Sequence, residues 1–234
     1  TDKVAAYDEF LRGWGHYLRL TPTDFEKAAF SFKKAIELDP NYARAYAALA
    51  LVYWAGSDFA LSGGLGIHWR EARLRSRTYL QKAMKQPTSI AYNVSSQMYL
   101  YRRQYKEAIL ELGKALSLDP NDPACLASMG WTLTMAGRPK EAIEYVNRGM
   151  RLDPNNPSRY LLLLGFAHFC MGELQEAAAL SEKALRLNPE NVGMGFPLAA
   201  FYGLMGRDQE ARTILATIRK KLRIWPLAAL MSYL

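Results

Sequence analysis

Residues 119–154 read DPNDPACLASMGWTLTMAGRPKEAIEYVNRGMRLDP, and this stretch decides the fold. It opens on Leu118 followed by Asp-Pro-Asn, and the same phrase returns at Leu152, 34 residues later. A fixed period of this length is typical of repeat proteins, in which each unit is one supersecondary motif. We therefore treat the stretch as one unit of a repeat.

The unit contains two helical patterns. Apolar residues at helical spacing predict a first helix over about 122–136 and a second over 139–152. Gly137 suits the left-handed residue that follows a helix, and Pro139 suits the first turn of the next one. Pro154 then ends the second helix, because proline cannot continue it. These features predict an antiparallel helical hairpin with a three-residue turn.

Two small residues, Gly130 and Ala142, lie where the two helices would cross. A large side chain there would hold the backbones apart, so we expect a close crossing. One hairpin leaves an apolar face uncovered and needs neighbours on both sides. The small residues and the closing Pro154 resemble the tetratricopeptide repeat. This resemblance implies an all-α fold, a right-handed superhelical solenoid of antiparallel helix pairs.

The same pattern recurs along the whole chain, which predicts a single solenoid over 1–234. Residues 56–66 are rich in Gly and Ser and read as a loop inserted in the second repeat, and 224–234 as a capping or truncated helix. The predicted repeats span 4–40, 41–87, 88–120, 121–154, 155–189 and 190–223.

The first and last repeats fit the pattern less closely. In the first repeat, Leu11, Gly15 and Leu18 are taken as the pattern's packed positions on the first helix, one residue out of step, and a threonine (Thr21 or Thr23) or Asp24 is expected to cap the second helix. In the second repeat, the second helix is expected over about 67–86. In the sixth repeat, the predicted matches are Leu198, Ala199, Tyr202, Ala211 and Leu215.

The net charge of +8 is concentrated in two segments, 66–86 at +5 and 207–223 at +4. Both are expected to be second helices on the outer face, where a solvated surface is one reading. An acidic partner, such as another domain of the same protein, is the other. Nucleic acid would be attracted to such charge, but no recognised nucleic-acid module accompanies it.

No run of about 18 apolar residues occurs, so no membrane span is expected. Cys125 and Cys170 are expected to be buried thiols, which favours a reducing, cytoplasmic location. Because the chain starts at Thr1, we expect it to be part of a longer protein.

No motif for catalysis, cofactor or metal binding is found, so we expect no enzyme activity and no cofactor. The three histidines lie on separate repeats. His168 occupies the position where other repeats have Tyr53, Tyr99 or Tyr202, so we expect it to pack rather than to bind a ligand.

The resemblance implies that the first helix of each pair lines a groove in which ligands bind. The groove would be mostly apolar and aromatic, which favours a protein or peptide partner with an apolar or amphipathic segment. Neighbouring repeats or the 56–66 loop could instead cover these residues. The candidates are Trp54, Asn93, Gln97, Tyr101, Trp131, Met135, Leu162, Phe166, Phe169 and Phe196.

Some tetratricopeptide domains clamp the terminal carboxylate of chaperone peptides with Lys, Asn and Arg side chains. The corresponding positions in this chain do not hold that set, so a chaperone-tail receptor is disfavoured. They read Arg12, His16, Ala48, Ile90 and Val94.

Four phrases, 6–14, 21–25, 38–46 and 69–73, resemble the tetratricopeptide region that follows the catalytic domain of bacterial class III adenylate or guanylate cyclases. Related regions follow DNA-binding domains in some transcriptional regulators. The resemblance implies a regulatory or scaffolding region of a multidomain bacterial signalling protein. A dimerisation module of that protein is the alternative, with 227–234 and the basic helix of the second repeat as candidate contacts.

Overall fold

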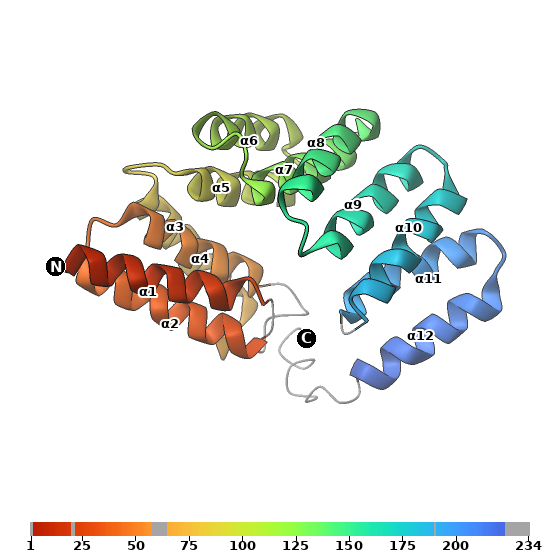
Figure 1. Ribbon diagram of the computed structural model, residues 1–234, viewed down its shortest axis with the longest axis horizontal. Coiled ribbons are helices and arrows are strands. Elements are labelled where there is room, and N and C mark those ends of the chain that lie inside the picture. The colour runs from red at the N-terminus through yellow and green to blue at the C-terminus, as the bar shows by residue number, and fades with distance from the viewer. Residues whose placement is uncertain (1, 20–21, 58–64, 190, 223–234) are drawn as a thin grey trace. The chain divides into compact units, whose positions relative to one another are not determined.

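The computed structural model describes residues 2–19, 22–57, 65–189 and 191–222. All regular structure in these ranges is helical, as expected, with a short 3₁₀ turn, η2 (Val192–Met194), before α11 (Figure 1). The α-helices are α1 (Asp2–Tyr17), α2 (Pro22–Leu38), α3 (Ala43–Ala55), α4 (Trp69–Ala83), α5 (Ser89–Tyr101), α6 (Tyr105–Leu118), α7 (Pro123–Met135), α8 (Pro139–Leu152), α9 (Pro157–Cys170), α10 (Leu174–Leu187), α11 (Gly195–Leu204) and α12 (Asp208–Leu222).

The chain divides into two compact units, the first ending at Met98 and the second beginning at Tyr99, within α5. In the first unit α1 packs on α2 and α3 packs on α4. In the second unit α7 packs on α8, α9 on α10 and α11 on α12, and each pair also contacts the next pair (Figure 1). Consecutive helix pairs are the arrangement that the repeat predicts. The single solenoid over 1–234 remains a prediction.

The turn chemistry of the fourth repeat agrees closely with its sequence pattern. Asp122 caps α7, where its carboxylate accepts hydrogen bonds from the backbone N–H groups of Ala124 and Cys125 at 2.9 and 3.1 Å. Gly137 has a left-handed φ of 76°, the conformation that glycine adopts without strain. The predicted start and end of α8 match the structure, and those of α7 are each within one residue.

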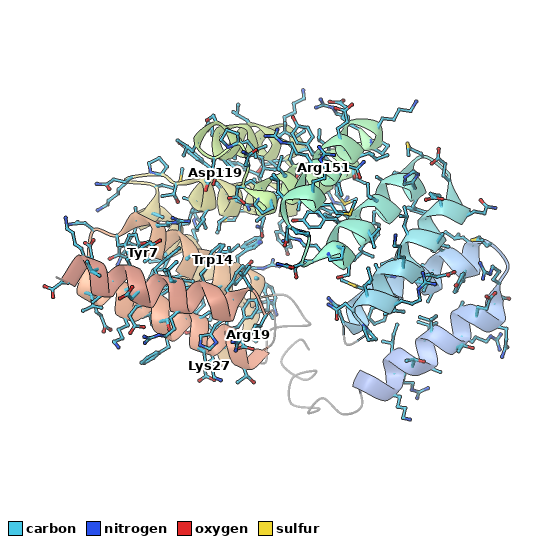
Figure 2. All side chains as sticks on the ribbon, viewed as in Figure 1. Tyr7, Trp14, Arg19, Lys27, Asp119 and Arg151 are labelled. Atoms are coloured by element: carbon cyan, nitrogen blue, oxygen red, sulfur yellow. The ribbon has the colours of Figure 1, made fainter. Side chains whose placement is uncertain are left out.

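The third and fourth repeats end with the same kind of cap. Asp119 follows α6 and Asp153 follows α8, and the backbone N–H of each still donates to the helix before it, at 3.0 Å in both cases. Figure 2 labels Asp119, and also Arg151 in the last turn of α8, among the side chains of the described residues. The 34-residue period therefore corresponds to one helix pair with its cap.

The close crossing predicted at Gly130 is confirmed. A Cβ atom at this position would lie 2.3 Å from Val146 Cγ2 and 3.2 Å from the carbonyl oxygen of Ala142. Gly165 occupies the same place in the next pair, where a Cβ would lie 2.9 Å from Ser181 Oγ. These glycines set the distance between the paired helices.

The assignment of Leu11, Gly15 and Leu18 to the packed face of α1 is wrong. Both leucines are exposed, and Gly15 faces open space. The close-contact glycine is Gly13, where a Cβ would lie 2.8 Å from the ring of Phe32. Phe32 follows Gly13 by 19 residues, whereas Val146 follows Gly130 by 16 and Ser181 follows Gly165 by 16, so counting back from α2 with the period of the later repeats gives the wrong position on α1.

Leu215 is also misplaced, because it is exposed on α12. Ile214 and Ile218 pack against α11 instead, where a Cβ on Gly195 would lie 3.3 Å from the first and 2.9 Å from the second. Together with Ala211 they follow the 3- and 4-residue spacing of one helix face.

Three smaller expectations also need correction. Asp24 lies inside α2 rather than at its cap, and its carboxylate oxygen is 2.9 Å from His16 Nδ1 and 3.3 Å from Arg19 Nη1. Thr23 also lies inside α2, and Thr21, another cap candidate, lies outside the described residues. The helix expected over 67–86 is α4, which is shorter at both ends.

The third correction concerns the cysteines. Cys125 is buried as expected, but Cys170 is exposed because it is the last residue of α9.

Of the inserted loop expected at 56–66, residues 58–64 lie outside the described residues. The flanking helices end at Ala55 and begin at Trp69, which leaves room for the insertion.

Candidate binding surface

Four aromatic rings connect the first helices of three successive pairs in the second unit. Trp131 of α7 meets Phe166 of α9 edge to face at 5.1 Å between ring centroids. Phe166 meets Phe201 of α11 edge to face at 6.1 Å, and Phe169 of α9 stacks on Phe201 at 5.0 Å. These separations lie within the range of favourable aromatic pairs. We call Trp131, Phe166, Phe169 and Phe201 the aromatic band.

The band extends from the core to the solvent. Phe201 is only 3% exposed, whereas Phe169, stacked on it, is 36% exposed. Trp131 and Phe166 are partly buried, and Phe166 also packs against the apolar cluster around Ala177. The band is therefore partly a structural contact between repeats and partly an accessible apolar surface.

The repeat explains why these rings meet. Trp131 and Phe166 each follow the small residue at the helix crossing, Gly130 and Gly165, and so occupy the same position in successive pairs. Since α7 and α9 are in contact, equivalent side chains on them are neighbours. The sequence-predicted pair Trp131 and Phe166 is thus brought together, and Phe169 joins them through Phe201.

The three helices that bear the band contain no acidic residue. Their only basic or imidazole side chains are Arg159, which is exposed, and His168. His168 Nδ1 lies 2.5 Å from a carboxylate oxygen of Glu173, the residue before α10, so this imidazole has a polar partner just beyond its own helix. That His168 packs rather than binds a ligand stays a prediction.

The remaining candidates of the second unit differ in exposure. Tyr101, Met135 and Phe196 are exposed, whereas Leu162 is partly buried against the cluster that contains Leu161. Of the ten predicted groove residues, the described contacts join three into one surface, and these are Trp131, Phe166 and Phe169.

The candidates of the first unit are engaged in local contacts. The Arg73 guanidinium of α4 lies over the ring of Trp54 at 5.3 Å. Asn93 is buried on α5, and its side-chain oxygen accepts a hydrogen bond from Gln97 at 3.2 Å. Trp54 is thus partly covered by the second helix of its own pair.

Phe201 was not among the predicted residues. The α11 sequence GFPLAAFYGL has no charged side chain, so its hydrophobic pattern does not distinguish a core face from a groove face. Counting by the repeat selects Phe196, which is exposed, instead of Phe201. The aromatic residues of α11 could be recognised from the sequence, but the direction in which each faces could not be predicted.

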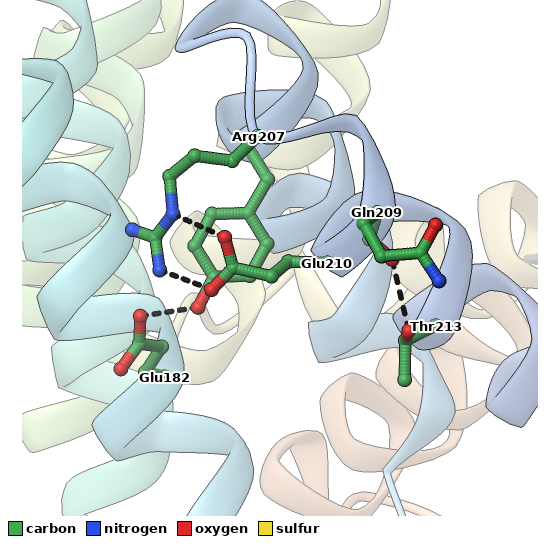
Figure 3. Close-up of polar contacts among 6 residues, drawn as sticks. Glu182, Arg207, Gln209, Glu210 and Thr213 are labelled. Atoms are coloured by element: carbon green, nitrogen blue, oxygen red, sulfur yellow. Dashed lines mark hydrogen bonds and ion pairs between the residues drawn. The ribbon is translucent and has the colours of Figure 1, made fainter.

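A polar network braces the helices beside the band (Figure 3). The Tyr202 hydroxyl of α11 donates to the Glu182 carboxylate of α10. Arg207 lies over the Tyr202 ring at 4.1 Å and makes two hydrogen bonds of 2.6 and 2.5 Å to Glu210 of α12. Burial and the bond to Glu182 raise the pKa of Tyr202 to about 12, so the phenol stays protonated and donates at neutral pH.

Within the described ranges, no three His, Cys, Asp or Glu side chains are grouped closely enough to hold a metal ion. No helix in the same ranges is long and apolar enough to cross a membrane.

Solved structures with a similar fold include the PilF protein of Pseudomonas aeruginosa, at 19% identity and a TM-score of 0.57, with 96% of this chain and 94% of that chain covered. PilW, described as a widely conserved type IV pilus biogenesis factor, matches at 21% identity and a TM-score of 0.60, covering 81% and 82%. The Cut9–Hcn1 hetero-tetramer of the APC/C matches at 17% identity and a TM-score of 0.62, with 89% of this chain and 38% of that chain covered. At these identities the likeness concerns the fold alone.

No curated protein matches the chain by sequence. A family description, "Tetratricopeptide repeat", matches residues 99–165 and 171–229, which is more than half of the chain. A second, "TPR repeat", matches residues 24–56. Together with the helix pairs, the 34-residue period and the small residues at the helix crossings, these matches show that the chain belongs to the tetratricopeptide repeat family.

Proposed function

We propose that this chain is a protein-binding module that holds an apolar or amphipathic protein segment on the aromatic band of its second unit. The observation that supports the proposal most directly is the stacked pair of Phe169 and Phe201. Phe201 is buried and holds the ring of Phe169 in place, while Phe169 keeps a face toward solvent. Rigid, partly exposed aromatic side chains of this kind dominate binding energy in protein interfaces.

The charge of the surface restricts the kind of segment that would bind there. The helices of the band offer no carboxylate, and Arg159 is their one exposed cation. A segment with apolar anchors and an acidic group near one end would satisfy both features, since opposite charges in an interface favour the right orientation. An amphipathic helix with anchors at i, i+3 or i+4 is the form we propose.

A peptide library of random sequence, displayed on phage and selected against the complete chain, tests this proposal. We expect apolar or amphipathic peptides, and we expect Phe169→Ala to weaken the binding of a synthetic copy about tenfold, as loss of a hot spot does. Phe30→Ala is the matched control, because Phe30 is an exposed phenylalanine of α2 in the first unit. Selected peptides that bind the Phe169→Ala variant as tightly as the wild type would exclude the aromatic band as the site.

The second part of the proposal concerns the longer protein to which this chain would belong. The phrases at 6–14, 21–25, 38–46 and 69–73 support a regulatory or scaffolding region of a bacterial signalling protein, such as a class III nucleotide cyclase of the cytoplasm. Sequencing the complete gene tests this directly. An open reading frame with no cyclase or other signalling domain next to residues 1–234 would refute it.

The single solenoid belongs to the same proposal, because Trp54, Asn93 and Gln97 would extend the binding surface only if the repeats are continuous. Small-angle scattering of the complete chain would detect two independently moving units, which would restrict the groove to the second unit. Dimerisation of the parent protein is the alternative function, and of its two candidate contacts the segment 227–234 lies outside the described residues.

A further inference from the structure

The first helix exposes a continuous row of large apolar side chains. We call Val4, Tyr7, Leu11, Trp14 and Leu18 the α1 stripe. Val4, Tyr7, Leu11 and Leu18 are 59%, 48%, 47% and 55% exposed, and Trp14 is partly buried. Figure 2 labels Tyr7 and Trp14 on this helix. Leu18 directly follows α1 and continues its geometry, because its N–H donates to the carbonyl of Trp14 at 3.1 Å.

Most of the stripe is distinct from the face that α1 buries in its own unit, and Trp14 borders that face, with its ring 6.0 Å from that of Phe10. Ala6, Phe10 and Gly13 form that face, with Phe10 and Gly13 in contact with Phe32 of α2. At 3.6 residues per turn, the five stripe positions fall within an arc of about 80°. Single exposed apolar residues are ordinary, but a contiguous row marks an interaction surface.

The spacing of the stripe indicates what covers it. Its members are separated by 3, 4, 3 and 4 residues, the period of 3.5 that allows two helices to pack along a common seam. Gly15 lies beside the stripe and faces open space, so another helix can approach closely there. A matching seam therefore requires a second helix with the same repeat, and a second copy of α1 satisfies this requirement.

Charges along one edge of the stripe set the direction of the pairing. The exposed Asp8 lies in the first half of α1, and Arg12 and Arg19 lie in the second half and after it. Both arginines bond to acidic residues of their own unit, Glu9 and Asp24, at 3.0 and 3.3 Å, but their side chains stay well exposed. In an antiparallel pair this edge faces its own copy, which brings Asp8 of one chain toward the arginine end of the other.

We propose that the α1 stripe binds the α1 stripe of a second copy of this chain, antiparallel and about a two-fold axis. Such an interface is isologous, because the same residues contribute from both chains. It lies in the first unit and does not use the aromatic band, so it is independent of the function proposed above. With one helix of 16 residues per chain it is small, and a reversible dimer is expected.

Sedimentation equilibrium of the complete chain from micromolar to millimolar concentration tests the proposal. We expect the wild type to rise from the monomer mass toward the dimer mass, and Leu11→Glu to remain monomeric with an unchanged circular dichroism spectrum. Leu204→Glu, at an exposed leucine of α11 in the other unit, is the matched control and should behave as the wild type. A wild type that stays monomeric throughout, or a Leu11→Glu variant that still dimerises, would overturn the proposal.

Crosslinking decides the direction of the pair. Val4→Cys and Leu18→Cys are made separately in a Cys170→Ser background, since Cys170 is the exposed native thiol. Mixing the two variants with a short bismaleimide should give the mixed 4–18 product far more readily than either variant alone gives its own dimer. Efficient 4–4 and 18–18 products instead would overturn the antiparallel arrangement.

Discussion

The substitution Gly130→Ala tests the packing on which the whole repeat depends. In an exposed helix this change would stabilise the protein by about 1 kcal/mol, because alanine is the better helix former. At the crossing of α7 and α8 we expect the opposite sign. The new Cβ would lie 2.3 Å from Val146 Cγ2, well inside an ordinary contact, and 3.2 Å from the backbone oxygen of Ala142.

The clash is difficult to relieve. Val146 is fully buried, packs in the cluster around Tyr160, and is β-branched, so its side chain has essentially one rotamer in a helix. Overpacking a core in this way costs about 1–3 kcal/mol. After the gain in helix propensity is subtracted, we expect Gly130→Ala to lower the free energy of unfolding by up to about 2 kcal/mol.

A double-mutant cycle separates this cause from others. Val146→Ala alone should cost about 2–3 kcal/mol, from lost burial and the cavity left behind. In the double variant the methyl group introduced by Gly130→Ala occupies the space that Val146 Cγ2 leaves. The double variant should therefore be about as stable as Val146→Ala or more so, with a coupling of about 2 kcal/mol between the two sites.

Urea unfolding of the complete chain, followed by circular dichroism, measures all four members of the cycle. Gly113→Ala is the matched control, because Gly113 lies in the middle of α6 with no atom within 4 Å of the added Cβ. It should be more stable than the wild type by about 0.5–1 kcal/mol. If the effects at residues 130 and 146 add within about 0.5 kcal/mol, the close-crossing argument is wrong.

Three further predictions concern single positions. Arg103→Gly should raise the thermal midpoint, by the equivalent of about 0.5–1 kcal/mol, because Arg103 has the left-handed φ of 59° that glycine holds in the equivalent turn at Gly137. Ser181→Ala should raise the free energy of unfolding in urea by about 1 kcal/mol, because the buried Ser181 hydroxyl has no partner in the described structure. Ser76→Ala should lower it, because the Ser76 hydroxyl donates to a backbone carbonyl of α3 at 2.7 Å. The pKa of Tyr202 is about 12 in the folded protein and near 10 in the unfolded chain, so its contribution to stability is complete below about pH 10 and is lost as the pH rises toward 12. Between pH 10 and pH 12, the thermal midpoint of Tyr202→Phe should therefore fall less steeply with pH than that of the wild type.

The fourth repeat could be predicted almost residue by residue, because its turn and its crossing each require a particular residue type. Gly137 is needed for the left-handed turn, Pro139 begins α8, and Gly130 is the residue that fits against Val146. The first repeat could not be placed in the same way. Phe32 follows Gly13 by 19 residues, whereas Val146 follows Gly130 by 16, so the period of the fourth repeat does not select Gly13 over Gly15.

The aromatic band was predicted less completely than the fold, for a related reason. Trp131 and Phe166 were found because they directly follow the crossing glycines, so the repeat fixes their position on adjacent helices. Phe201 was missed because α11 is apolar on every side, and amphipathic contrast is the signal that orients a helix. Trp54 was placed on the correct helix, but no sequence pattern predicts that Arg73 lies over its ring.

If the aromatic band is the binding surface that we propose, packing and binding are linked through the same positions of the repeat. Gly130 and Gly165 allow each first helix to approach its second helix, and the rings one residue later project from backbones held at that distance. The 5.1 Å contact between Trp131 and Phe166 depends on both crossings, since a wider crossing in either pair would move one ring relative to the other. Substitutions at the glycines should therefore weaken ligand binding through the geometry of the aromatic band, although neither glycine has a side chain that could contact a ligand.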